Sequence, residues 1–244
     1  KLVTEITKAD VEKLLAKVAE GRARPHKDKP NNRARKLQPA RPTPVRANRL
    51  GEALRKMFSL AVEWEMRADN PASSFYRRIE NARECFLTKD EIDRLAKALD
   101  ADEDQRAAGI IRICLLTGAR VGEVRQSRFE QFNLERGIWT KPAATTKQRK
   151  IHRVPISDEV AAIVRERHLV VPKGNPWLFP GDVPGQPVRE IRRFWRRIQV
   201  AAEIGDARIH DLRHTFASLL VSGGASLEMI GKLLGHTQMQ TTQR

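Results

Sequence analysis

The last 35 residues of the chain constrain its fold most strongly, because capping residues and glycines divide them into short helices with defined ends. Asp211 is suited to cap a helix with one apolar face, and Gly223-Gly224 is suited to end it. Ser226 opens a second apolar helix, which Gly235 closes. A Thr–Gln capping box at 237–240 begins a third. The stretch therefore predicts three helices joined by tight turns.

Basic residues occupy the ends of these predicted helices. His210 and Arg213 lie at the first turn of the first helix, where free backbone N–H groups and the positive end of the helix dipole favour an anion. His236 follows the glycine that closes the second helix, so its backbone geometry is fixed. Together these positions predict a phosphate-binding site.

The chain has a net charge of +16, and both of its parts are basic. Residues 1–83 contain 20 Lys/Arg against 10 Asp/Glu, and residues 84–244 contain 26 against 20. Such an excess predicts a polyanionic partner, and without an apolar run of membrane-spanning length we expect nucleic acid and no membrane. A generically basic soluble protein is the plain alternative, since 40% apolar and 31% charged residues describe a soluble globular chain.

Residues 1–83 predict a small helical domain that contains a basic loop. Thr7 can cap a helix over 9–19, and a longer helix is expected from Asn48 to about Ala68. Between them, residues 22–49 hold ten Lys/Arg, five prolines and one acidic residue, and too few large apolar residues for a core. We expect a basic loop there, either as a solvated linker or as part of a DNA-binding surface.

Residues 84–244 predict a second, larger domain that is mainly α-helical with a small antiparallel β-sheet. An almost continuous apolar run over 104–117 predicts its central helix, which Gly118 ends. Arg120 lies in the junction after that helix, and Glu123, one turn further on, is placed to orient the Arg120 guanidinium. Residues 137–140 and 151–156 predict two strands. Further helices are expected at 88–99, 157–168 and 188–202.

Two other basic features each allow two interpretations, a role in binding DNA or in catalysis, or a solvated surface without such a role. Lys147, between the two predicted strands, can reach a phosphate or donate a proton, and Lys141 or Lys150 can take its place. A merely solvated lysine-rich hairpin is the alternative. The arginines on the polar side of the 188–202 helix either contact DNA or form a solvated face.

Four separated motifs resemble the tyrosine recombinase family, the phage-integrase type of site-specific recombinases. In chain order they are TGARVGE (117–123), TTK (145–147) before VPIS (154–157), HDLRH (210–214) and LGH (234–236). The resemblance covers 84–244 as the catalytic domain, and 61–72 resembles the end of the helical core-binding domain. It implies a recombinase that cuts and rejoins double-stranded DNA at a recombination site through a 3′-phosphotyrosine link, integrating or excising a mobile element.

The resemblance also assigns roles to residues. The implied catalytic set is Arg120, Lys147, His210, Arg213 and His236, with Glu123 as a supporting residue. Two guanidiniums can stabilise the charge that grows on a phosphate without a metal, so no metal and no cofactor are expected. Further implied are a tetramer on DNA, a monomer when the chain is free and truncated, a DNA-bending or directionality factor as an additional partner, and a place in the bacterial cytoplasm or nucleoid.

The sequence departs from the family at the nucleophile. The family's tyrosine lies on the helix after LGH, whereas the only tyrosine here is Tyr76, in the interdomain region. We expect the nucleophile just after Arg244, and no DNA cleavage by a chain that ends there. Two other hypotheses remain: a non-catalytic DNA-binding or regulatory protein on the same fold, and a topoisomerase-like DNA relaxer. A tyrosine soon after Arg244 favours the recombinase, and plasmid relaxation without recombination favours the relaxer.

Overall fold

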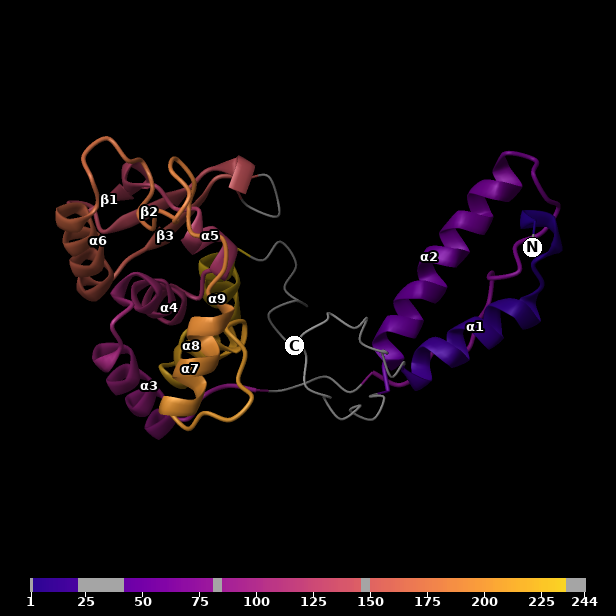
Figure 1. Ribbon diagram of the computed structural model, residues 1–244, viewed down its shortest axis with the longest axis horizontal. Helices are drawn as coiled ribbons and strands as arrows, with labels where there is room; N and C mark the ends of the chain where they lie inside the picture. The colour runs from indigo at the N-terminus through magenta and orange to yellow at the C-terminus, as the bar shows by residue number, and fades with distance from the viewer. Residues whose placement is uncertain (1, 22–41, 81–84, 146–149, 236–244) are drawn as a thin grey trace, which may run out of the picture. The chain divides into compact units, whose positions relative to one another are not determined.

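The computed structural model describes residues 2–21, 42–80, 85–145 and 150–235. It divides into two compact units, Lys1–Arg83 and Glu84–Arg244 (Figure 1). Each unit has a hydrophobic core of its own. The architecture is mainly helical with one small antiparallel sheet, as the sequence predicted. Among the described helices, none combines the length and the apolar character that crossing a membrane requires.

In the described residues of the first unit, two helices pack against each other, α1 (Lys8–Glu20) and α2 (Pro44–Glu63), after a 3-10 turn, η1 (Val3–Glu5). Thr7 caps α1 as predicted, with its hydroxyl accepting a hydrogen bond from the Asp10 backbone N–H. Apolar residues of both helices form the core between them, among them Leu15 and Phe58.

Helix α2 begins and ends earlier than the sequence predicted. Pro44 occupies its first position, where a proline needs no N–H partner, so the last part of the predicted 22–49 loop is helical. Asn48, predicted as the start of the helix, is buried within it, and its side-chain amide donates to the Arg78 carbonyl at 2.8 Å. The helix ends at Glu63, and Glu65 follows with a left-handed φ of 55°. Residues 22–41 of the predicted loop lie outside the described residues.

The second unit is built around α4 (Gln105–Thr117), whose nearly all-round apolar surface is buried as predicted. Asp104 caps α4 by accepting a hydrogen bond from the Ala107 N–H, and Gly118 ends it with a φ of 63°. Around α4 lie α3 (Lys89–Ala101), α5 (Val121–Arg125), α6 (Asp158–Val170) and α8 (Asp211–Ser222). Helix α7 (Arg192–Ala201) packs on α3, and α9 (Leu227–Leu234) packs on α8 (Figure 1).

The sheet has three antiparallel strands in the order β1 (Phe132–Asn133), β2 (Ile138–Lys141) and β3 (His152–Pro155). In the β2–β3 pair, Trp139 lies opposite Val154 and Lys141 opposite His152. The sequence predicted β2 and β3 but missed β1, because two residues are too short for an alternating pattern. Two 3-10 turns, η2 (Phe129–Gln131) and η3 (Ala143–Thr145), precede β1 and follow β2.

Two helix starts in the second unit differ from their predictions. Helix α7 begins at Arg192 and not at Val188, because the Val188 N–H donates to the Phe179 carbonyl in a short bridged segment. The N-cap of α8 is His210 and not Asp211. The Asp211 carboxylate instead accepts a hydrogen bond from the backbone N–H of Arg208 at 2.8 Å, which closes the turn before the helix.

Helix α9 has the predicted caps at both ends. The Ser226 hydroxyl accepts a hydrogen bond from the Met229 N–H, and Gly235 adopts a left-handed φ of 68° after the last turn. Because α9 packs on α8 and contacts β3, these caps fix where its C-terminal end lies against the rest of the unit. The third helix predicted from 237 lies outside the described residues.

Candidate active site

Arg213 is a deeply buried cation of the candidate site. It lies in the first turn of α8 and is 5% exposed, which is rare for an arginine. Its Nη1 donates to the Gly118 carbonyl and its Nη2 to the Leu234 carbonyl, both at 2.7 Å. These carbonyls belong to the C-terminal ends of α4 and α9, where helix dipoles favour a cation. A single guanidinium therefore ties two helix ends together.

Arg120 and Glu123 form the second part of the site. Arg120 is the N-cap of α5, and its Nη1 donates to Glu123 Oε1 at 2.9 Å, the contact that the sequence predicted. Glu123 also accepts from the Arg120 backbone N–H with Oε2 at 3.3 Å, so the pair closes a capping box. The Arg120 side chain is 34% exposed, whereas that of Glu123 is 8% exposed. The Arg120 side chain is thus partly exposed to solvent, whereas the Glu123 carboxylate that orients it is buried.

Lys141 extends this pair in a way that the sequence did not indicate. It ends β2 with only 2% of its surface exposed, and its Nζ lies 2.9 Å from Glu123 Oε2. Burial opposes ionisation of Glu123, but the charges and hydrogen bonds of Lys141 and Arg120 hold the pKa of Glu123 below its usual value. Burial lowers the pKa of Lys141, and the Glu123 carboxylate offsets only part of that effect.

The two arginines belong to one electrostatic environment. Burial, followed by the positive charge of Arg120, lowers the pKa of Arg213 to about 10. Lys141 has a lowered pKa in part because both arginines lie near it. The structure therefore brings Arg120, Arg213 and Lys141 into one positively charged region, with Glu123 as their shared acidic neighbour.

His210 lies at the edge of this region. It is exposed, and its ring meets that of His214 edge-on with centroids 5.2 Å apart. Desolvation of the ring, followed by the neighbouring His214 and the charges of Arg213 and Arg120, lowers the pKa of His210. The imidazole is consequently neutral at neutral pH, the form that can accept a proton.

His152 supports the end of α9, a role that sequence reasoning missed. It is half-buried on β3, and its Nε2–H donates to the Lys232 carbonyl at 2.9 Å. The ring is also close to Gly235, because a Cβ added to that glycine would lie 3.0 Å from His152 Cε1. The only signal in the sequence was the alternation of the strand, which does not identify a partner 80 residues away.

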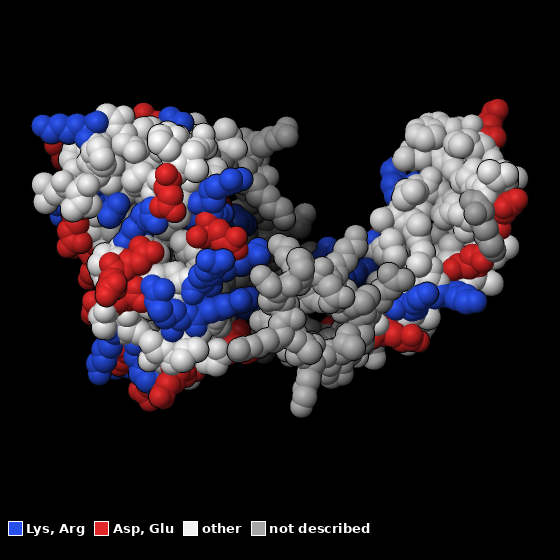
Figure 2. All heavy atoms as spheres, in the orientation of Figure 1, with Lys and Arg blue, Asp and Glu red and all other residues white. Residues whose placement is uncertain are grey.

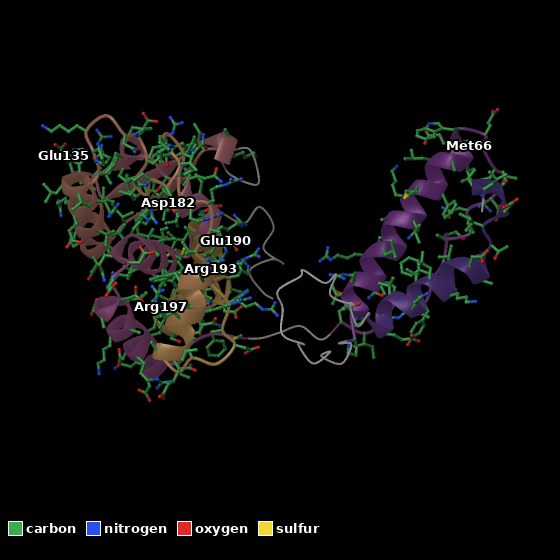
Figure 3. All side chains as sticks on the ribbon, in the orientation of Figure 1. Met66, Glu135, Asp182, Glu190, Arg193 and Arg197 are labelled. Atoms are coloured by element: carbon green, nitrogen blue, oxygen red, sulfur yellow. The ribbon has the colours of Figure 1, made fainter. Side chains whose placement is uncertain are left out.

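The arginines of α7 form a mixed surface and not a continuous cationic one. Figure 2 shows Lys and Arg side chains gathered over α7 with acidic side chains beside them. Arg197 makes two 2.7 Å hydrogen bonds to the Asp102 carboxylate, and Arg192 Nε lies 2.7 Å from Glu190. Among the described residues, no acidic side chain forms an ion pair with Arg193, which projects from the same helix (Figure 3).

Comparison with known proteins identifies the family. Residues 85–244 match the phage integrase family. The chain belongs to this family of tyrosine recombinases. The tyrosine recombinase XerD of Pasteurella multocida (strain Pm70) is 31% identical over 210 residues, which cover 80% of this chain and 69% of XerD. The integrase of Escherichia phage P2 is 31% identical over 211 residues, which cover 85% of this chain and 56% of that integrase.

Solved structures give the same result for the fold of this phage integrase family member. The catalytic domain of bacteriophage HP1 integrase is 29% identical with a TM-score of 0.53, covering 66% of this chain and 86% of that one. A lambda integrase (75–356) dimer bound to a COC′ core site is 16% identical with a TM-score of 0.74, covering 98% of this chain and 82% of that one. At this identity the second likeness shows the fold alone.

The structure describes three of the five residues that the sequence assigned to the catalytic set. It brings Arg120, His210 and Arg213 together from α5 and α8. Lys147 and His236 lie outside the described residues. Within the described part of the chain, no group of three or more His, Cys, Asp or Glu side chains is arranged to hold a metal ion.

Proposed function

We propose that this phage integrase family member is a site-specific recombinase that cuts and rejoins double-stranded DNA through a 3′-phosphotyrosine intermediate, and so integrates or excises a mobile element. The observation that carries the proposal is the pairing of Arg120 and Arg213, which two separate elements hold within one positively charged region. Two such guanidiniums can donate hydrogen bonds to the non-bridging oxygens of one phosphate.

The proposed reaction is an in-line displacement at phosphorus. A tyrosine oxygen attacks the scissile phosphate, a P–O bond to tyrosine forms, and the P–O bond to the 5′ oxygen breaks. Arg120 and Arg213 stabilise the negative charge that grows on the phosphate, while Lys147 gives a proton to the departing oxygen. His210 accepts the tyrosine proton, for which its lowered pKa is suited, and His236 contacts the phosphate.

The nucleophile of this proposal is a tyrosine outside the 244 residues. Tyr76 is the only tyrosine of the sequence, and it belongs to the first unit, where the residue is 68% exposed. Its ring centroid lies 5.9 Å from the guanidinium carbon of Arg78 in the same unit. We place the missing residue just after Arg244, following the order of motifs in the family.

The proposed partner is double-stranded DNA, bound by both units. The charge excess of residues 1–83 supports a role for the first unit as a core-type DNA-binding domain. Relatives of the fold bind DNA: the XerH recombinase, 20% identical with a TM-score of 0.73, was solved bound to difH substrate as a pre-cleavage complex. We propose assembly as a tetramer on DNA, with a DNA-bending or directionality factor as an additional partner.

A denaturing gel of labelled DNA tests this function. The natural gene product is incubated with a nicked duplex built on the sequence that it selects from a randomised duplex library, and covalent adducts are scored. Arg213→Ala should reduce adduct formation far more than DNA affinity, because affinity is spread over many basic contacts whereas Arg213 meets charge that grows during the reaction.

Arg165→Ala, at an exposed position of α6, is the matched control and should change neither quantity. An unsubstituted gene product that binds the duplex and yields no adduct would favour the non-catalytic, DNA-binding interpretation. Relaxation of supercoiled plasmid without any recombinant product would instead favour a DNA relaxer.

A further inference from the structure

We infer that Lys141 is a positioning residue, which holds the Glu123 carboxylate so that it orients Arg120 through a single hydrogen bond and leaves the site positively charged. The inference deepens the proposed function and rests on it. It concerns a side chain at the end of β2, outside the set of residues that the motifs assign to the reaction.

The surroundings of Lys141 show that its ammonium group has a defined partner. Its side chain is 3% exposed, and Nζ lies 2.9 Å from Glu123 Oε2 and 4.5 Å from the centroid of the Trp139 ring. A buried ammonium group is strongly unfavourable unless it is paired, so these contacts fix its position. The same burial makes Lys141 unsuited to replace Lys147 as a proton donor to DNA, since its Nζ is enclosed and bonded to Glu123.

The two oxygens of Glu123 have different side-chain partners, and this division orients the Arg120 guanidinium. Oε1 accepts from Arg120 Nη1 at 2.9 Å, whereas Oε2 accepts from Lys141 Nζ at 2.9 Å and from the Arg120 backbone N–H at 3.3 Å. An arginine and a carboxylate that meet without competition commonly form two parallel hydrogen bonds. Because Lys141 Nζ and the Arg120 backbone N–H both bind Oε2, the guanidinium of Arg120 makes one hydrogen bond to Glu123, which orients it without using a second guanidinium N–H group.

Lys141 also changes the charge that the site presents. If Glu123 had Arg120 as its only partner, one carboxylate would neutralise one guanidinium. With Lys141 as a second cation on the same carboxylate, the three groups together carry one positive charge, to which Arg213 adds another. In a region of low dielectric constant, this excess favours binding of an anionic phosphate and of its transition state.

Single-turnover kinetics on the natural gene product provide the test. Protein in excess acts on the nicked duplex described above, and both the rate constant and the final amount of covalent adduct are measured, together with DNA affinity by fluorescence anisotropy. Lys141→Met should lower the rate constant by about ten- to a hundredfold, the range for a displaced catalytic group, while affinity and final amount change by less than about twofold. Lys97→Met, at an exposed position of α3, removes the same charge and should change none of these quantities.

A merely structural role for Lys141 gives a different result, which would overturn the inference: the final amount of adduct falls with the folded fraction, while the rate constant is unchanged.

A second comparison covers the case in which Lys141→Met does not fold. Because Lys141 positions Arg120 only through Glu123, the double variant Glu123→Gln/Lys141→Met should lose much less than tenfold in rate constant relative to Glu123→Gln alone, a small loss for which the removed charge accounts. A further tenfold loss in the double variant would contradict the inference.

NMR of the 244-residue chain separates this inference from the proposed function. The Nε–H resonance of Arg120 reports the environment of its guanidinium whether or not the protein cuts DNA. It should shift in Lys141→Met and stay in place in Lys97→Met. If the natural gene product forms no adduct, the proposed function fails, yet this shift still supports the positioning role. An unmoved Arg120 resonance overturns that role in either case.

Discussion

Replacement of Gly118 by alanine should destabilise the second unit at the point where three helices meet. Gly118 has a left-handed φ of 63°, and an added Cβ would lie 2.5 Å from Phe216 Cδ1 and 2.7 Å from Leu234 Cδ2. Both distances are too short for carbon atoms in contact, so the side chains from α8 and α9 would have to move. The Gly118 carbonyl also accepts a hydrogen bond from Arg213, so the movement would reach the candidate site.

The expected loss has a backbone part and a packing part. A left-handed conformation costs an alanine roughly 1–2 kcal/mol relative to glycine. Displacement of well-packed side chains costs a further 1–3 kcal/mol, roughly. Gly224→Ala is the matched control, because Gly224 has a φ of 80° and an added Cβ there would meet nothing within 4 Å. That variant should lose the backbone part alone.

The assay is denaturant-induced unfolding, followed by the fluorescence of the buried Trp139 and Trp195, which both lie in the second unit. The free energy of unfolding should fall by roughly 1–3 kcal/mol more in Gly118→Ala than in Gly224→Ala. In the natural gene product, Gly118→Ala should also slow adduct formation because it shifts the carbonyl that holds Arg213. Equal destabilisation by the two variants would refute the packing argument.

Two further predictions concern helix caps and pH. Thr88→Ala removes the side chain that accepts from the Glu91 N–H at the start of α3, and should lower the free energy of unfolding by about 1 kcal/mol in the same assay; an unchanged midpoint would contradict it. Burial is the main reason why the pKa of His152 lies below the usual histidine value of 6.5. The unfolded chain therefore binds the proton more readily than the folded chain, and the free energy of unfolding falls as pH decreases below 6.5. His152→Gln should therefore lose less stability than the unsubstituted chain between about pH 7.5 and about pH 5.5, and equal losses would contradict the assignment.

The features that the sequence predicted correctly depend on residues close together in the chain. Caps at Thr7, Thr88 and Ser226 each involve a partner three residues away, and the glycines that end α4 and α9 act through their own φ angles. Local chemistry of this kind can be deduced from a short window of sequence. Arg120 and Arg213 could likewise be identified from the short sequence motifs that contain them.

The features that the sequence did not predict depend on distant partners. Asn48 was predicted to start a helix, but its side chain bonds the backbone of Arg78, thirty residues away, inside a helix that starts earlier. Lys141 was one of several lysines near a hairpin until the fold placed it against Glu123. A short window of sequence cannot distinguish a residue with a local partner from one with a distant partner. Tertiary packing, and not local propensity, decides which hydrogen bond forms.

In the described part of the candidate site, three neighbouring cations are held by two kinds of hydrogen-bond acceptor, a carboxylate and backbone carbonyls. Arg120, Arg213 and Lys141 repel one another, and burial alone would disfavour the charged forms of Arg213 and Lys141. One carboxylate, Glu123, pairs with two of these cations, whereas Arg213 is held by backbone carbonyls at the C-terminal ends of two helices. Carbonyl dipoles orient a guanidinium without carrying a full negative charge, so they hold Arg213 while leaving most of its positive potential in place. A second carboxylate in their position would hold it equally well and would repel the phosphate for which we propose the site is built.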